Sequence, residues 1–157
     1  MRVETKARAR VLQALYAWDL RGEKNLERVA TQVWDDLAVS AEERRIAGPL
    51  VRTIASSGAA IDAELTEVTT NWRLNRLGAV ERSVLRLAAA ELTRGETPPR
   101  VVIQEVVRLA ERYGSAQSAR FVNGVVDALA RRMGKLEGRA ARGAGRVARD
   151  AGGPPPR

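Results

Sequence analysis

The first candidate site is a polar stripe on the N-terminal segment, which carries cations, an amide and a phenol at helical spacing. Lys6, Arg10 and Gln13 are separated by four and then three residues, so a helix would project them from one face. Arg8 would flank this face from the side, and Tyr16 follows along the same helix. Cations contact phosphates, while amides and phenols contact the sugars and base edges of a single strand. The spacing therefore predicts a surface that binds single-stranded nucleic acid.

The residue types that are missing argue against catalysis. The chain contains no Cys and no His, which excludes thiol nucleophiles, His-based triads and zinc sites built on these side chains. Adjacent acids at 35–36 and 42–43 fall at the ends of expected helices, where capping and helix-dipole compensation explain them better than metal binding. We therefore expect a protein that is not an enzyme, with no catalytic residue, no metal and no cofactor.

The distribution of charge points to an anionic partner. The 157 residues carry a formal charge of +8, from 27 basic and 19 acidic side chains. By region, the net charge is +3 over residues 1–21, −3 over 22–75, +4 over 76–134 and +4 over 135–157. The positive charge thus belongs to the first expected helix, the later helices and the C-terminal end. This asymmetry favours a basic patch over a uniformly basic surface.

Helical periodicity dominates the chain up to about residue 134, and no strand alternation of useful length occurs. Start and stop signals divide the pattern at Gly22, Asn25, Ser40, Pro98 and Ser115. Pro49 falls inside the third stretch and should kink or split it, because proline has no N–H to donate. About seven helices are predicted, over residues 4–21, 25–37, 40 onward, 58–71, 79–94, 98–113 and 116–133.

Apolar faces predict how these helices pack. Residues 79–94 are apolar around most of the helix circumference, which is typical of a buried central helix. Trp18, Trp34 and Trp72 fall on apolar stripes and are expected in the core. Helices joined by short loops predict a compact all-α domain over residues 1–134.

The pattern changes at the C-terminal end. From residue 135 onward Ala, Gly, Arg and Pro dominate, so we expect a disordered basic tail over residues 135–157. No run of 18 apolar residues predicts a transmembrane helix, and the N-terminal segment lacks the uninterrupted apolar stretch of a secretion signal. We therefore expect a cytoplasmic protein without a membrane partner.

Three segments of the chain occur in an order and spacing typical of one known family. They are KARARVLQALYAWD at 6–19, NWRLNRLGAVERSVLRLAAAEL at 71–92 and VVIQEVVRLAERYGSAQSARFVNGVVDALA at 101–130. The string FVNGV at 121–125 is the most specific of these motifs. Together they resemble the NusB family of transcription antitermination factors, over about residues 5–131.

The resemblance implies a fold, a role and a set of partners. NusB proteins are all-helical, with two small helical subdomains, and they form a complex with NusE, a ribosomal protein of the small subunit. The pair binds the boxA element of nascent single-stranded RNA. It helps the transcribing RNA polymerase to read through terminators, mainly in ribosomal RNA operons. The resemblance thus implies a non-enzymatic RNA-binding antitermination factor that acts with NusE.

The resemblance also implies which residues make the contacts. Glu81, at the start of the central helix, matches a position used against the ribosomal-protein partner. RNA contact is implied for Lys6, Arg8, Arg10, Gln13, Tyr16, Gly114, Ser115, Gln117, Ser118, Arg120 and Phe121. The chain departs from many family members at Glu4 and Thr5, where further Arg is common, and at Gln117 and Ala119, which replace an acid and a His. A neutral residue at 117 favours the approach of phosphate.

Two alternatives stand beside this interpretation. A NusB-like domain also forms the N-terminal part of some ribosomal RNA cytosine methyltransferases. Those enzymes need a Rossmann-like catalytic domain with a nucleophilic Cys, and this chain has no Cys. The other alternative is a homodimeric helical module that uses the RNA-facing surface for self-association, since some family members dimerise.

Overall fold

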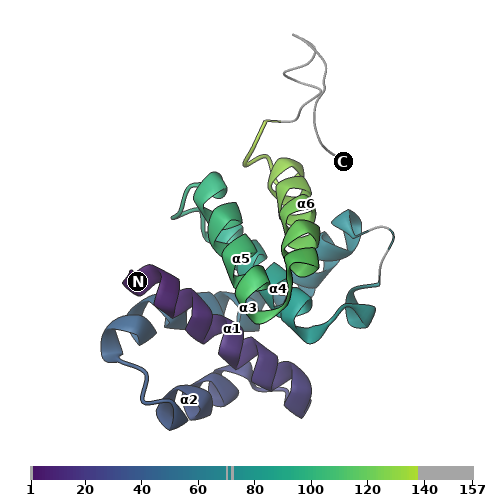
Figure 1. The fold of residues 1–157 in the computed structure, drawn as a ribbon. Coiled ribbons are helices and arrows are strands. Elements are labelled where there is room, and N and C mark those ends of the chain that lie inside the picture. The colour runs from purple at the N-terminus through teal and green to yellow at the C-terminus, as the bar shows by residue number, and fades with distance from the viewer. Residues whose placement is uncertain (1, 70, 72, 138–157) are drawn as a thin grey trace.

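The computed structural model describes residues 2–69, 71 and 73–137 of the chain (Figure 1). Its elements are α1 (Val3–Arg21), α2 (Leu26–Asp36), α3 (Ala41–Val68), the 3-10 turn η1 (Leu74–Arg76), α4 (Ala79–Arg94), α5 (Pro99–Tyr113) and α6 (Ala116–Arg132). The described residues contain no strand, which confirms the all-α prediction. Within this part of the chain, no helix combines the length and apolar composition that a membrane span requires.

The ends of the helices follow the local signals in the sequence. α1 ends at Gly22, which has a left-handed backbone with φ of 67° and donates its N–H to the Trp18 carbonyl at 3.1 Å. Three predicted N-caps are confirmed, because their side-chain oxygens accept a backbone N–H at 3.0–3.1 Å: Asn25, Ser40 and Ser115. Capping depends on residues only a few positions apart, so these boundaries can be predicted from the sequence.

The third and fourth predicted helices form one element, α3, which bends at Ser57 and not at Pro49. The backbone is non-helical at Ser57, with φ of −117° and ψ of 19°, and it runs helically through Pro49. The expected interruption at Pro49 is therefore wrong. The described residues form six α-helices and not seven, because the third and fourth predicted helices are joined at Ser57, one residue before the predicted start of the fourth. Next to Pro49, Leu50 and Val51 are buried, and α3 packs against α1. This packing offsets the hydrogen bond that proline cannot donate.

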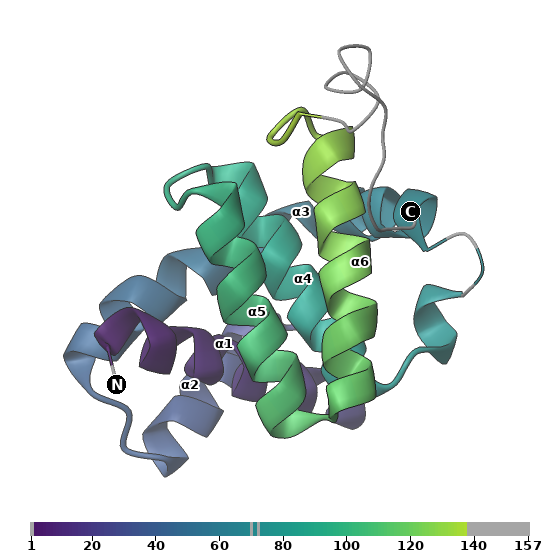
Figure 2. The same ribbon diagram turned by 45° about the horizontal axis from the view of Figure 1, so that its top comes forward.

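α4 occupies the centre of the fold, as predicted for a helix that is apolar nearly all round. From Ser83 to Leu92 every residue is buried except Arg86, whose side chain is still only 12% exposed. α1, α3, α5 and α6 all pack against this helix. Figures 1 and 2 show α5 and α6 side by side over α4, while α1 packs against both α4 and α2. α4 and α3 thus join two small helical groups.

Two of the three tryptophans predicted in the core pack there. Trp34 is buried, and its Nε1–H donates to the Arg10 carbonyl at 3.0 Å, which fixes α2 against α1. Trp18 is partly buried against the core. Trp72 lies outside the described residues.

The chain stays packed slightly beyond the predicted end of the domain. After α6, the Lys135 N–H donates to the Ala130 carbonyl at 2.8 Å, and Leu136 packs against the core. Helix-terminal carbonyls are thereby satisfied by the residues that follow. Most of the predicted tail, residues 138–157, lies outside the described residues.

Candidate nucleic-acid and partner-binding surfaces

The outer face of α1 carries several of the predicted RNA-binding residues. Lys6 is exposed, Gln13 is half-buried and Tyr16 is 40% exposed. The opposite face is buried and consists of Ala7, Arg8, Val11, Leu12, Ala14 and Leu15. Leu20, which is 64% exposed, lies one turn beyond Tyr16, and sequence reasoning missed it although the i, i+4 spacing signals it. The outer face therefore offers a cation, an amide, a phenol and an exposed leucine to a partner.

The structure does not place Arg8 on that outer face. The residue is only 7% exposed, and its guanidinium makes two hydrogen bonds to Glu91, at 2.6 and 2.9 Å, and one to Glu105, at 3.3 Å. Burial by itself lowers the pKa of Arg8, but the hydrogen bond and charge of Glu91 raise it above its ordinary value. The RNA contact predicted for Arg8 is thus corrected to an interior ion pair that joins α1 to α4 and α5.

A signal for this burial is present in the sequence. Arg8, Leu12 and Leu15 follow the i, i+4, i+7 spacing of one helix face, so Arg8 begins the buried stripe of α1. Glu91 lies near the end of the most apolar helix of the chain, within the run LAAAEL at 87–92. A cation on one apolar face and an anion on another indicate a buried pair, because neither charge is stable alone in the interior.

Arg10 lies at the edge of the outer face and is engaged with α3. Its Nε donates to Glu43 at 2.7 Å, and its Nη1 donates to the Gln13 side chain at 3.2 Å. Glu43 also lies three residues after Ser40, the N-cap of α3, and donates its backbone N–H to the Ser40 hydroxyl. The hydrogen bond from Arg10 is the main cause that holds the pKa of Glu43 below its ordinary value. Arg10 is therefore less available to phosphate than the exposed Lys6.

The Glu43→Gln variant tests this pair through the pH dependence of stability. Because the folded state lowers the pKa of Glu43, its charge stabilises the fold above the unfolded pKa of about 4.3. That contribution is lost as the pH falls from this value through the lower pKa of the folded state. We expect urea denaturation to give wild type an advantage over Glu43→Gln near neutral pH that disappears toward about pH 3. If the stability of wild type and of Glu43→Gln differed equally near neutral pH and at about pH 3, the pairing of the Glu43 carboxylate with Arg10 would be contradicted.

The second predicted surface is the turn between α5 and α6 and the first turns of α6. Gly114, Ser115, Gln117 and Arg120 are exposed, Phe121 is half-buried and Ser118 is buried. Gly114 is required for space, because a Cβ there would lie 2.8 Å from both the Ala110 carbonyl oxygen and the Ser118 hydroxyl. The tight turn starts α6 directly and presents its N-terminal residues to solvent.

The structure brings Glu81, the predicted contact for a protein partner, onto this second surface. A depression of about 390 Å³ is lined by Arg76, Leu77, Gly78, Glu81, Ser115, Gln117, Ser118 and Phe121. Inside it, the Ser118 hydroxyl donates to the Glu81 carboxylate. Sequence reasoning assigned the partner contact and the RNA contacts to separate segments, and it did not foresee that they share one depression. Arg76 is a further cation that it missed.

Polar contacts hold the two surfaces in a fixed relation. The Thr5 hydroxyl donates to Glu105 at 2.9 Å, which ties the start of α1 to α5. Arg82, next to Glu81, pairs with Asp19 near the end of α1. Figures 1 and 2 agree that the α5–α6 turn lies alongside the second half of α1. The turn that lines the depression and the second half of α1 are therefore neighbours in the fold.

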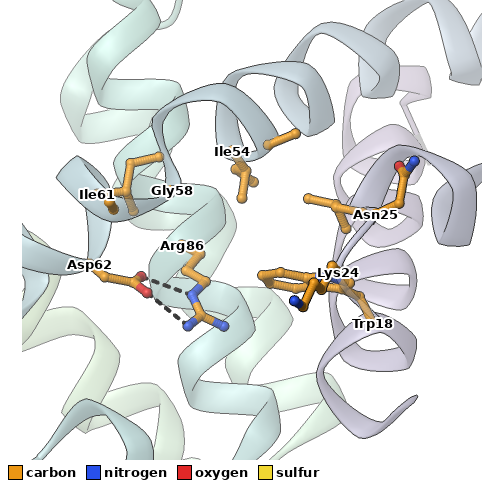
Figure 3. A pocket seen from close by; sticks show the side chains of 11 residues that line it. Trp18, Lys24, Asn25, Ile54, Gly58, Ile61, Asp62 and Arg86 are labelled. Carbon is orange, nitrogen blue, oxygen red and sulfur yellow. Dashed lines mark hydrogen bonds and ion pairs between the residues drawn. The ribbon is translucent and has the colours of Figure 1, made fainter. Parts of the chain in front are cut away.

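A separate cleft of about 580 Å³ opens where α3 bends (Figure 3). Arg86 makes two hydrogen bonds of 3.0 Å to Asp62 there, and its guanidinium lies 5.4 Å from the centre of the Trp18 ring. None of the predicted site residues lines this cleft. Its contacts tie α1, α3 and α4 together. Across residues 2–69, 71 and 73–137, no group of three or more acidic side chains is arranged to hold a metal ion.

Comparisons with known proteins identify the family. The sequence profile described as "NusB family" matches residues 5–131. The transcription antitermination protein NusB of Anaeromyxobacter dehalogenans (strain 2CP-1 / ATCC BAA-258) is 43% identical over 127 residues, which are 80% of this chain and 89% of the relative. The corresponding protein of Sorangium cellulosum (strain So ce56) is 39% identical over 138 residues, or 87% and 98% of the two chains.

A solved structure agrees with these sequence relatives. The crystal structure of antitermination factors NusB and NusE in complex with dsRNA contains a chain that is 33% identical to this one. It superposes with a TM-score of 0.75 and covers 82% of this chain and 96% of its own. The matched relatives are antitermination proteins, which confirms the prediction of a factor that is not an enzyme. On its sequence and its helical fold alike, the chain belongs to the NusB family of transcription antitermination factors.

Proposed function

We propose that this chain binds boxA-type single-stranded RNA together with the ribosomal protein NusE, and that the complex promotes read-through by the transcribing RNA polymerase in ribosomal RNA operons. The observation that carries the proposal is the likeness to a NusB chain solved with NusE and dsRNA, at 33% identity over most of both chains. That neighbour holds a protein partner and an RNA at once. The proposal assigns both kinds of partner to one side of the present molecule.

The arrangement of side chains supports this assignment. Lys6 and Arg120 are exposed cations on α1 and α6, and Tyr16 and Phe121 offer aromatic rings from the same two helices. Cations bind the phosphates of a single strand, and aromatic rings stack on its bases. Glu81 carries a carboxylate that suits a basic group of the protein partner. RNA and protein contacts would then lie next to each other.

A titration of labelled boxA-type RNA, with and without purified NusE, tests the proposed function. We expect weak binding by the chain alone and tight binding when NusE is present, because the two proteins then share the RNA. Affinity should fall linearly on a plot of log K against log salt concentration, since phosphate contacts release counterions. Fluorescence anisotropy at several salt concentrations measures both properties.

Two matched RNAs serve as controls in the same titration. A scrambled single strand of equal length and a duplex of the boxA-type sequence separate sequence-specific binding from general attraction to phosphate. The proposal requires the boxA-type single strand to bind more tightly than the scrambled strand when NusE is present. Equal affinity for all three RNAs, or no binding in the presence of NusE, would overturn it. Self-association that NusE and RNA leave unchanged would support the homodimeric alternative.

A further inference from the structure

One short chain of polar contacts connects the α5–α6 turn to the first turn of α4. The Ser115 hydroxyl accepts the Ser118 backbone N–H at 3.0 Å, and the two hydroxyl oxygens are 3.1 Å apart. The Ser118 hydroxyl then donates to the Glu81 carboxylate. Ser118 is 7% exposed, so water competes little for this bond. The segment expected to touch RNA and the carboxylate expected to touch a protein are thus two groups of one network.

Gly78 has no side chain, and this leaves the space that the Glu81 carboxylate occupies. It precedes α4 as its N-cap, with φ of −61°, a backbone conformation that any residue adopts. The Glu81 carboxylate occupies the position that a Cβ at residue 78 would take. The carboxylate is therefore folded back over the N-terminus of α4, where the helix dipole favours a negative charge. One carboxylate oxygen, Oε2, accepts from Ser118, and the other, Oε1, lies over Gly78.

We propose that Ser118 is a positioning residue that holds the Glu81 carboxylate and thereby couples RNA binding at the α5–α6 turn to protein binding at α4. This inference rests on the function proposed above. In the structure the carboxylate is held by Ser118; in a second, proposed arrangement, the carboxylate is released toward the depression. RNA that orders the turn fixes Ser118 and favours the held arrangement. A basic group of NusE then meets a carboxylate already in place, and its binding reciprocally favours the ordered turn.

The coupling is measured as the ratio of RNA dissociation constants without and with saturating NusE. We expect this ratio to be about tenfold smaller for Ser118→Ala than for wild type, within the range typical of coupled binding sites. A loss of direct RNA contact lowers RNA affinity by the same factor without and with NusE, so it cancels in the ratio. The ratio therefore separates a positioning role from a contact that Ser118 itself makes with RNA.

Two further variants complete the test. Ser83→Ala is the matched control, because Ser83 is a fully buried hydroxyl on α4 for which the described structure shows no hydrogen-bond partner. It should leave the ratio at the wild-type value. Gly78→Ala removes no hydroxyl but pushes the Glu81 carboxylate away from Ser118, so it should lower the ratio as Ser118→Ala does. Only the carboxylate end of the flexible Glu81 side chain must move to make room for the new methyl group. Gly78→Ala should therefore still fold, and circular dichroism checks this.

The outcomes distinguish this inference from the proposed function. A wild-type ratio in both Ser118→Ala and Gly78→Ala overturns the coupling and leaves the proposed function standing. A reduced ratio in both variants, with Ser83→Ala unchanged, supports the coupling. A reduction of the same size in Ser83→Ala contradicts it, because any disturbance of α4 would then have the effect. Failure of wild type to bind RNA in the presence of NusE overturns the proposed function and the coupling together.

Discussion

Arg8→Ala is expected to lower the free energy of unfolding by about 3–5 kcal/mol, the cost of breaking a buried ion pair from one side. Glu91 is only 5% exposed, and the substitution leaves its carboxylate in the interior without the two hydrogen bonds that Arg8 supplies. Glu105 also loses a partner, although Thr5 and Arg108 still donate to it. Urea denaturation followed by circular dichroism measures the change, which should shift the midpoint without altering the slope.

Two control variants show whether the loss of stability comes from breaking the buried ion pair. Arg28→Ala removes an exposed arginine from α2 and should change stability by no more than about 0.5 kcal/mol. The double variant Arg8→Met with Glu91→Leu removes both charges and should recover most of the stability, because apolar residues of similar size often replace a buried ion pair without cost. If Arg8→Ala were as stable as wild type and bound RNA poorly, Arg8 would be an RNA contact and not an interior pair.

Replacing both Lys6 and Arg120 by Gln is expected to make RNA binding less sensitive to salt. Both residues are exposed, and neither lies within ion-pair distance of a carboxylate in the described part of the chain. Each phosphate contact removed should reduce the slope of log K against log salt by about one unit, so the double variant should lose about two. Affinity should fall for boxA-type and scrambled RNA alike, since phosphate contacts carry no sequence information.

A matched pair of exposed arginines shows whether the position of the charge matters. Arg52 lies on α3, and Arg100 lies at the beginning of α5, the opposite end of that helix from the α5–α6 turn. Arg52→Gln with Arg100→Gln removes the same two charges and should leave the salt slope near the wild-type value. A slope reduced equally in both double variants would mean that RNA is attracted by the overall charge of the protein and not by this side of it.

The prediction from sequence was most successful where structure depends on neighbouring residues. Gly22, Asn25 and Ser115 mark helix ends because a left-handed residue or a side-chain cap acts within one turn. The buried α4 could also be predicted, since a helix that is apolar nearly all round can only be stable in the interior. Pro49 was misjudged by the same local reasoning, because the packing of α3 against α1 outweighs one missing hydrogen bond.

By itself, the sequence determined the all-α class, the central helix, the exposed position of Lys6 and Arg120 and the membership of the NusB family. The tertiary structure decided that Arg8 is buried against Glu91 and that Glu81 is held by Ser118. Each of these contacts joins residues more than 30 positions apart, so its existence depends on which helix faces meet when the chain folds. Periodicity defines the faces of a single helix, but only packing selects the charges that must pair when water is excluded.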